Sequence, residues 1–382
     1  MKMPIYLDYN ATTPVAPEVI DAMLPFLREH FGNPSSSHAY GLSARQAIAD
    51  ARASVAGLVN AKSDEIVFTG SATEANNLAL LGVVRALGHA KRHLVVSAIE
   101  HPAIMMPAQH LHEMGWDLTV VPVDGYGRVD PHVVAAAVRS DTALVSIMHA
   151  NNEVGTIQPI TEIARIIRPM GILLHTDAAQ SAGKIELDVN ALGVDLLTLA
   201  GHKFYATKGA GALYVRSGTP IKPIMFGADQ EHGLRPGTEN VPLIVGLGAA
   251  AKLAREQLPA VTEKLRALRD ALHGRLMAAV PGLALNGHLT ERLPNTLHLS
   301  FPCISGRELL SRVAGRVAAS VGSACHSDTD VVSGVLAAMG YNASRARGAV
   351  RLSVGRMSTP EEIETAATAL SEGVADLFGR RR

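Results

Sequence analysis

Short apolar runs alternate with longer amphipathic stretches between about residues 45 and 215. Stretches such as 72–88 and 160–171 repeat their apolar residues at the spacing of one helix face. This alternation predicts a mostly parallel sheet with helices on both faces. We expect seven strands, within residues 65–70, 93–100, 118–123, 143–150, 171–177, 195–201 and 211–217.

The pattern changes beyond residue 240. A long helical stretch covers roughly residues 242–279, and strand-like runs follow at 296–301 and 349–355 with helices between them. They predict a smaller α+β domain, against which the N-terminal segment YLDYNATTP is expected to pack. The expected fold class is therefore α/β in two parts. Residues 15–255 form the large domain, and residues 1–14 with 256–382 form the small one.

Composition excludes several classes of protein. The chain has 382 residues, and its 35 basic side chains balance 35 acidic ones, which favours neither nucleic-acid binding nor a membrane-surface role. No apolar run reaches the roughly 18 residues of a membrane span, and the start MKMPIYLDYN does not resemble a signal peptide. Only two cysteines occur, without zinc-ligand spacing, so we expect a cytoplasmic protein with no metal site.

Polar residues directly follow five of the predicted strands. In an open α/β sheet, ligands bind beyond the carboxyl ends of the strands. We therefore expect these residues to meet at one edge of the sheet and to form a binding site. They are Ser71, Thr73 and Glu74, Glu100 and His101, Asn151 to Glu153, Asp177 and Gln180, and His202 and Lys203.

Each of these positions also has an ordinary structural explanation. The segment GSATEANN starts a helix whose free N–H groups can hold a phosphate, or Ser71 is a simple N-cap with Glu74 as its partner. Asp177 either pairs with a cation such as a protonated pyridine nitrogen or caps the next helix. His101 is either structural or a ring that stacks on a cofactor and moves protons.

The two cysteines differ in their surroundings. Cys303 ends an apolar strand and is expected to be a small core residue. Cys325 lies among small and polar residues, where packing has little use for it, and His326 beside it could lower its pKa. Cys325 is therefore a candidate nucleophile. Arg351 either clamps a substrate carboxylate or forms an internal ion pair.

Taken together, the chain resembles the class V branch of fold-type I enzymes that use pyridoxal 5′-phosphate (PLP). Within that branch it is similar to the cysteine desulfurases of iron–sulfur cluster assembly and to the selenocysteine lyases. The motifs that carry the resemblance occur in order along the whole chain. They are YLDYNATTP, FGNPSS, FTGSATEANN, EHPA, ANNEVGT, HTDAAQ, GHKFY, RPGTEN, GSACHS and RLSVGR.

The resemblance implies a homodimer that binds PLP and converts L-cysteine to L-alanine. Lys203 would bind PLP covalently, and Cys325 would take the sulfur as a persulfide and pass it to a sulfur acceptor or an iron–sulfur scaffold protein. Further contacts are implied for nine residues. His101 would stack on the ring, Asp177 would pair with its nitrogen, and Gln180 would bind its oxygen. The phosphate would be held by Ala72, Thr73, His202 and the second subunit's Thr238. Asn152, beside the cofactor, would bind the substrate carboxylate together with Arg351.

Two departures from the family pattern matter for function. Ala200 stands where many relatives carry a serine, which removes one phosphate-binding hydroxyl. His326, Ser327 and Asp328 after the cysteine are closer to selenocysteine lyases than to the CTS of many desulfurases. Two alternatives to a desulfurase therefore stay open, a selenocysteine lyase for L-selenocysteine and a class V aminotransferase without sulfur transfer.

Overall fold

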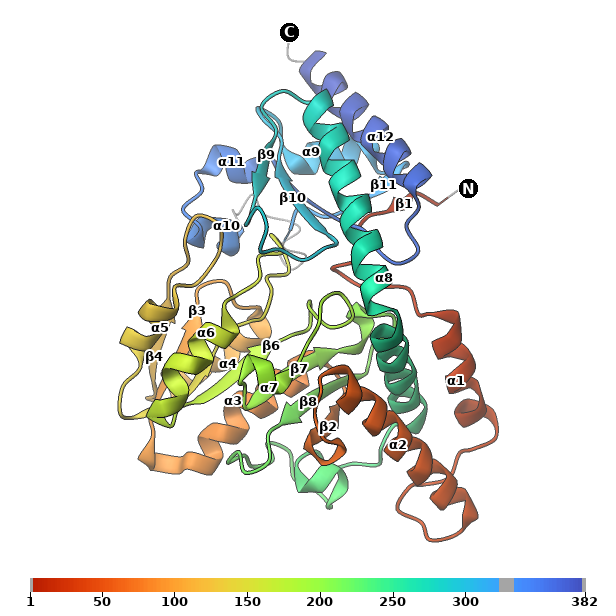
Figure 1. Cartoon of the computed structure of the whole chain (residues 1–382), viewed down its shortest axis with the longest axis vertical. Helices are drawn as coiled ribbons and strands as arrows, with labels where there is room; N and C mark the ends of the chain where they lie inside the picture. The colour runs from red at the N-terminus through yellow and green to blue at the C-terminus, as the bar shows by residue number, and fades with distance from the viewer. Residues whose placement is uncertain (1–2, 323–332, 380–382) are drawn as a thin grey trace.

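The computed structural model describes residues 3–322 and 333–379. Two sheets lie at opposite ends of the long axis in Figure 1, and the helix α8 (Val241–Ala279) runs lengthwise beside both. One end of α8 packs on α1 (Pro17–Arg28) and α2 (Ala39–Leu58), and the other packs on α12 (Pro360–Gly379).

All seven strands expected in the first part of the chain form one sheet. Its order is β2-β8-β7-β6-β5-β3-β4, and β8 alone runs in the opposite direction to the other six strands. The α/β fold class with a mostly parallel seven-stranded sheet is thus confirmed. The strands are β2 (Ile66–Thr69), β3 (His93–Ser97), β4 (Asp117–Val121), β5 (Thr142–Ser146), β6 (Leu173–Asp177), β7 (Leu196–Ala200) and β8 (Gly211–Val215).

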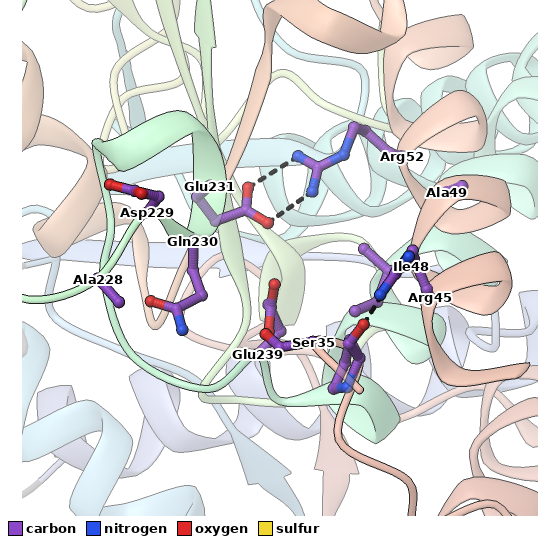
Figure 2. A pocket seen from close by; sticks show the side chains of 11 residues that line it. Ser35, Arg45, Ile48, Ala49, Arg52, Ala228, Asp229, Gln230, Glu231 and Glu239 are labelled. Atoms are coloured by element: carbon purple, nitrogen blue, oxygen red, sulfur yellow. Dashed lines mark hydrogen bonds and ion pairs between the residues drawn. The ribbon is translucent and has the colours of Figure 1, made fainter. Parts of the chain in front are cut away.

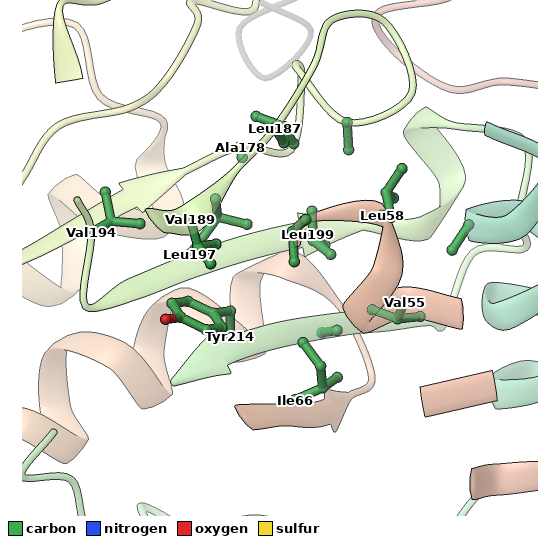
Figure 3. Packing of buried hydrophobic residues seen from close by; sticks show 14 of the residues in the cluster. Val55, Leu58, Ile66, Ala178, Leu187, Val189, Val194, Leu197, Leu199 and Tyr214 are labelled. Atoms are coloured by element: carbon green, nitrogen blue, oxygen red, sulfur yellow. The ribbon is translucent and has the colours of Figure 1, made fainter. Parts of the chain in front are cut away.

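The two faces of this sheet bury separate apolar cores, because successive side chains along a strand point to opposite faces. In β7, Leu196 faces one core, whereas Leu197 and Leu199 face the other. Figure 3 shows Leu197 near Val189 and Tyr214, and Leu199 on the side of Val55 and Leu58 of α2. The helices that follow the strands cover these faces. They are α3 (Ala72–Leu87), α4 (Pro102–Glu113), α5 (Pro131–Ala137), α6 (Ile160–Ile167) and α7 (Val189–Leu192).

The smaller sheet is antiparallel, with the order β12-β10-β9. The N-terminal segment packs against this part as expected, since β1 pairs with β11 and Asp8 bridges to Ser353. The predicted boundary after residue 255 falls inside α8, and the division into domains stays a prediction. The elements here are β1 (Ile5–Tyr6), β9 (Ala284–Asn286), β10 (Thr296–Ser300), β11 (Val317–Ala318), β12 (Ala349–Ser353), α9 (Gly306–Val313), α10 (Gly334–Ala338) and α11 (Ala343–Arg347).

The expectation that Cys303 is a core residue is wrong. The strand β10 already ends at Ser300, so Cys303 lies in the turn that follows, where it is exposed and has a φ angle of +58°. Within the described ranges, the structure contains no helix with the length and hydrophobicity needed to cross a lipid bilayer.

A cavity of about 480 Å³ lies between α2 and the segment 228–239 (Figure 2). A bidentate ion pair between Arg52 of α2 and Glu231 spans it, with nitrogen–oxygen distances of 2.5 and 2.7 Å. Glu231 also accepts a hydrogen bond from the Phe68 amide at 2.7 Å. The Glu231 side chain is 2% exposed, so its charge depends on this partner. The pair therefore ties the segment 228–239 to α2 and β2.

We expect Arg52→Ala to lower the free energy of unfolding by about 3 kcal/mol, because it leaves a buried carboxylate without a cation. The matched control is Arg275→Ala. Its ion pair with Glu364 is exposed on both sides and should be worth about 0–1 kcal/mol. Urea denaturation followed by circular dichroism measures both. Equal losses in the two variants would contradict the role assigned to Arg52.

Candidate active site

The predicted strand ends meet as expected, around a cavity of about 650 Å³ that also touches the small sheet. The predicted site residues that line it are Ala72, Thr73, His101, Asn152, Asp177, Gln180, His202, Lys203 and Arg351. Thr238 is exposed and does not line this cavity. Cys325 lies outside the described residues.

Lys203 stands in the turn after β7, and its amine points at the N-terminal segment. The Nζ atom donates hydrogen bonds to the main-chain oxygens of Asn10 at 2.7 Å and Ala11 at 2.8 Å. Burial, followed by the nearby positive charge of Arg351, lowers the pKa of Lys203 to about 8. Lys203 is therefore not an ordinary surface lysine, because a sizeable fraction of its amine is neutral and nucleophilic near neutral pH.

Asp177 ends β6 at the floor of the cavity and is 5% exposed. Its two oxygens accept hydrogen bonds from the Asn76 side chain at 2.7 Å and from the Ala179 amide at 2.9 Å. Among the described residues, no cationic side chain lies within ion-pair distance of this carboxylate. A buried carboxylate facing a cavity without a cation suits a ligand that brings its own positive charge.

Glu100 is a second buried acid beside the same cavity, where the sequence placed it among the strand-end residues without assigning it a specific role. It accepts hydrogen bonds from the Ser97 hydroxyl at 2.5 Å and the Met148 amide at 2.8 Å. Burial raises the pKa of Glu100 to about 8, and the Asp177 charge adds to this rise. Glu100 is thus mostly neutral at pH 7.

The start of α3 forms another wall. Ser71 is its N-cap and accepts from the Glu74 amide at 3.1 Å, as the ordinary explanation expects. The Glu74 carboxylate accepts from the Gly70 amide at 2.7 Å, one residue before the position that a capping box requires. Ala72 and Thr73 still line the cavity, and the first N–H groups of a helix have no intrahelical acceptor. A Cβ at Gly211 would lie 2.7 Å from the Ser71 carbonyl carbon, so glycine lets β8 pass close to this turn.

Two histidines border the cavity as neutral rings. His101 is the N-cap of α4, and its Nδ1 accepts from the Ala103 amide at 3.1 Å, which leaves the proton on Nε2. Burial lowers the pKa of His101, because less water is available to solvate the charged ring. His202 has its Nδ1 3.2 Å from the Thr12 hydroxyl, and burial lowers its pKa to about 4.

Arg351 enters the cavity from β12 of the small sheet. Its guanidinium donates to the main-chain oxygens of Asn152 at 3.0 Å and Gly322 at 3.1 Å, and it pairs with Asp8 at 2.7 Å. Arg351 thus forms the internal ion pair that was one of its two explanations. It also lines the cavity, where the contact with a substrate carboxylate stays a prediction.

Asn10 is the main contributor that sequence reasoning missed. It is 1% exposed and borders the cavity. Its main-chain oxygen accepts from Lys203 and from the Gln180 side chain at 3.0 Å, and its side-chain amide donates to the Thr296 hydroxyl at 2.9 Å. The available signal was its place in YLDYNATTP, a segment whose packing was predicted but whose contact with Lys203 was not.

These residues fit the PLP that the sequence resemblance implies. An amine with a lowered pKa matches covalent attachment, and the buried carboxylate of Asp177 matches a protonated ring nitrogen. The side-chain oxygen of Asn76 beside it is buried and has no hydrogen-bond partner, as at a site that awaits a polar group. The start of α3 supplies N–H groups for a phosphate.

Comparisons with known proteins agree with this geometry. The family model Aminotransferase class-V matches residues 5–365. A protein named cysteine desulfurase IscS from Dictyoglomus turgidum is 45% identical over 364 residues, 95% of this chain and 92% of that protein. A solved structure of a NifS-like protein is 38% identical with a TM-score of 0.92, covering 98% of this chain and 100% of that chain. A structure described as SspA in complex with cysteine is 36% identical with a TM-score of 0.83, covering 93% and 99%.

The lowered pKa of Lys203 gives a testable pH dependence. Attachment of PLP to the apoprotein needs the neutral amine, so its rate should rise with pH around a midpoint near 8 rather than 10.5. At pH 8 about half of this amine is neutral, against about 0.3% of an ordinary lysine. Stopped-flow absorbance measures the rate, and Lys203→Ala should abolish it. A midpoint at 10 or above would contradict the assignment.

Proposed function

The chain belongs to the aminotransferase class V family, and from this premise we propose how its cavity carries out the reaction of a cysteine desulfurase. The protein is a PLP-dependent enzyme that takes sulfur from L-cysteine and releases L-alanine. The observation that carries the proposal for its site is the meeting of Lys203 and Asp177 in one cavity. This meeting occurs in a chain that matches cysteine desulfurases over nearly its full length.

When bound, PLP supplies an electron sink for the negative charge that remains once the substrate Cα loses its proton. We propose that Lys203 holds the cofactor until the substrate amine takes its place, and that the freed Lys203 amine then removes this proton as the general base. A pKa of about 8 suits this work near neutral pH. The protonated amine would then be stabilised by the main-chain oxygens of Asn10 and Ala11, which already accept from Nζ.

The remaining wall residues bind and orient. In the proposal, Asp177 neutralises the cofactor ring nitrogen, His101 packs on the ring, and Gln180 contacts its oxygen. Asn152 and Arg351 bind the substrate carboxylate at the side of the cavity nearest the small sheet. The position of all five around one cavity supports these roles.

We assign the sulfur-accepting step to Cys325. Its thiolate attacks the substrate sulfur, so a sulfur–sulfur bond forms while the substrate Cβ–S bond breaks. Cβ then takes up a proton, and return of a proton to Cα completes alanine. Gly322 and Ser333, on either side of the undescribed residues, both line the cavity.

The localisation, the oligomeric state and the sulfur acceptor are also proposed. We place the enzyme in the cytoplasm, as a homodimer that passes its persulfide sulfur to an acceptor protein for iron–sulfur cluster assembly or thiolation. Thr238 is exposed and away from its own cavity, which supports a role in the site of a second copy. The similarity to proteins named IscS supports the acceptor.

Cys325→Ala should abolish release of alanine and sulfide from L-cysteine but leave PLP binding intact, because the thiol acts on the substrate after the cofactor is in place. Cys303→Ala is the matched control, since Cys303 is the other cysteine of the chain and lies in an exposed turn. Its activity should stay within about twofold of wild type. Undiminished turnover by Cys325→Ala would overturn the assignment.

The choice between sulfur and selenium is tested with the two substrates. We expect L-cysteine to give alanine and sulfide in equal amounts in the presence of a thiol reductant. A selenocysteine lyase would release alanine from L-selenocysteine but almost none from L-cysteine, and the ratio of kcat/KM values measures this. An aminotransferase would instead convert the cofactor to its amine form and recover with a keto acid, without releasing sulfide.

A further inference from the structure

A second lysine, Lys184, is buried directly behind the cavity. It is 5% exposed and does not line the cavity itself. No carboxylate of the described residues lies within ion-pair distance of its amine. Burial, followed by the charges of Lys203 and Arg351, lowers the pKa of Lys184 well below the usual value of a lysine. A buried amine of this kind is costly unless it serves a defined arrangement.

The partners of Lys184 are two side-chain amide oxygens. Its Nζ donates to Gln180 Oε1 at 3.0 Å and to Asn10 Oδ1 at 3.3 Å. A hydroxyl of α8 also fixes the backbone here, since Thr262 donates to the Lys184 carbonyl at 2.8 Å. Lys184 is therefore held between the cavity wall and α8, with its amine directed at Gln180.

These contacts determine which way the Gln180 amide points. The Lys184 amine carries N–H donors whether it is charged or neutral, and one of them is directed at the oxygen of Gln180. The Nε2 group then lies on the opposite side, where it donates to the main-chain oxygen of Asn10 at 3.0 Å. That Asn10 oxygen can only accept, so it requires this orientation, and the Lys184 contact agrees with it. Nε2 has a second N–H, and Gln180 borders the cavity.

We propose that Lys184 is a positioning residue that orients Gln180 so that its N–H group, and not its oxygen, is presented to the anionic ring oxygen of bound PLP. The inference rests on the proposed function, because it takes PLP as the occupant of the cavity. Loss of the Lys184 amine leaves Gln180 Oε1 buried without a donor. The amide then rotates or recruits water, and the contact with the ring oxygen weakens.

A double-mutant cycle tests whether Lys184 acts through Gln180. Lys184→Met and Gln180→Leu should each raise the dissociation constant of PLP by about 3- to 10-fold, the range expected for one hydrogen bond. Adding Lys184→Met to Gln180→Leu should change it by less than about twofold, because the amide to be oriented is gone. Additive effects would overturn the proposal.

The second readout is the pH titration of the bound cofactor's visible absorbance. The titrating proton is shared between the ring oxygen and the Lys203 nitrogen attached to the cofactor. Removal of a donor from the ring oxygen makes that oxygen a better acceptor for this proton, so the midpoint of the pH titration should rise in both single variants. The matched control Lys208→Met makes the same chemical change at an exposed turn and should leave the midpoint unchanged.

Lys184→Gln separates orientation from charge and covers the case in which Lys184→Met does not fold. It keeps N–H donors but carries no charge, so recovery of the wild-type midpoint supports orientation of Gln180. If Lys184→Gln shifts the midpoint, and adding it to Gln180→Leu shifts the midpoint by the same amount, the effect comes from charge and the proposal is overturned. Absence of cofactor absorbance from the wild-type protein would instead overturn the proposed function, which keeps the two failures distinct.

Discussion

The hydrogen bonds of Asn10 are the constraint on which the rest of the site depends. Its main-chain oxygen holds Lys203 and Gln180 from the large sheet, and its side chain binds Thr296 and Asn295 of the small sheet region. A buried amide with every group paired permits one arrangement, because any rotation places donor against donor or acceptor against acceptor. The cavity between the two sheets is therefore set by a residue near the start of the chain.

The second constraint is removal of the site from water, which decides the charge of each group. Burial makes Glu100 mostly neutral, lowers the pKa of Lys203 to about 8 and keeps His202 uncharged at neutral pH. Asp177 is hydrogen-bonded to Asn76 and Ala179. In the proposed site, the cationic ring nitrogen of the cofactor would balance the charge of its carboxylate. Exclusion of water disfavours unpaired charges because it lowers the local dielectric constant. It also strengthens each remaining electrostatic contact with a bound anion or cation.

Local patterns predicted the strands and the strand-end residues, because periodicity and strand ends are properties of neighbouring positions. The antiparallel direction of β8 was not predictable in this way, since it depends on how distant segments pair. Asn10 and Lys184 were missed for a related reason. Their roles come from partners far away in the sequence, such as Asn295 for Asn10 and Thr262 for Lys184. Cys303 was misplaced by extending an apolar run past the end of β10.

Ala200 links cofactor retention to assembly. It is 1% exposed and lines the cavity, yet it offers no hydroxyl to a phosphate. The proposed contacts within one chain are then the start of α3 with Thr73 and the neutral ring of His202, so the proposed Thr238 contact from a second copy gains in importance. A ligand held partly by each subunit binds the dimer more tightly than the monomer, and by mass action it stabilises the dimer in return. In the proposed assembly, loss of PLP and dissociation of the subunits are therefore thermodynamically coupled.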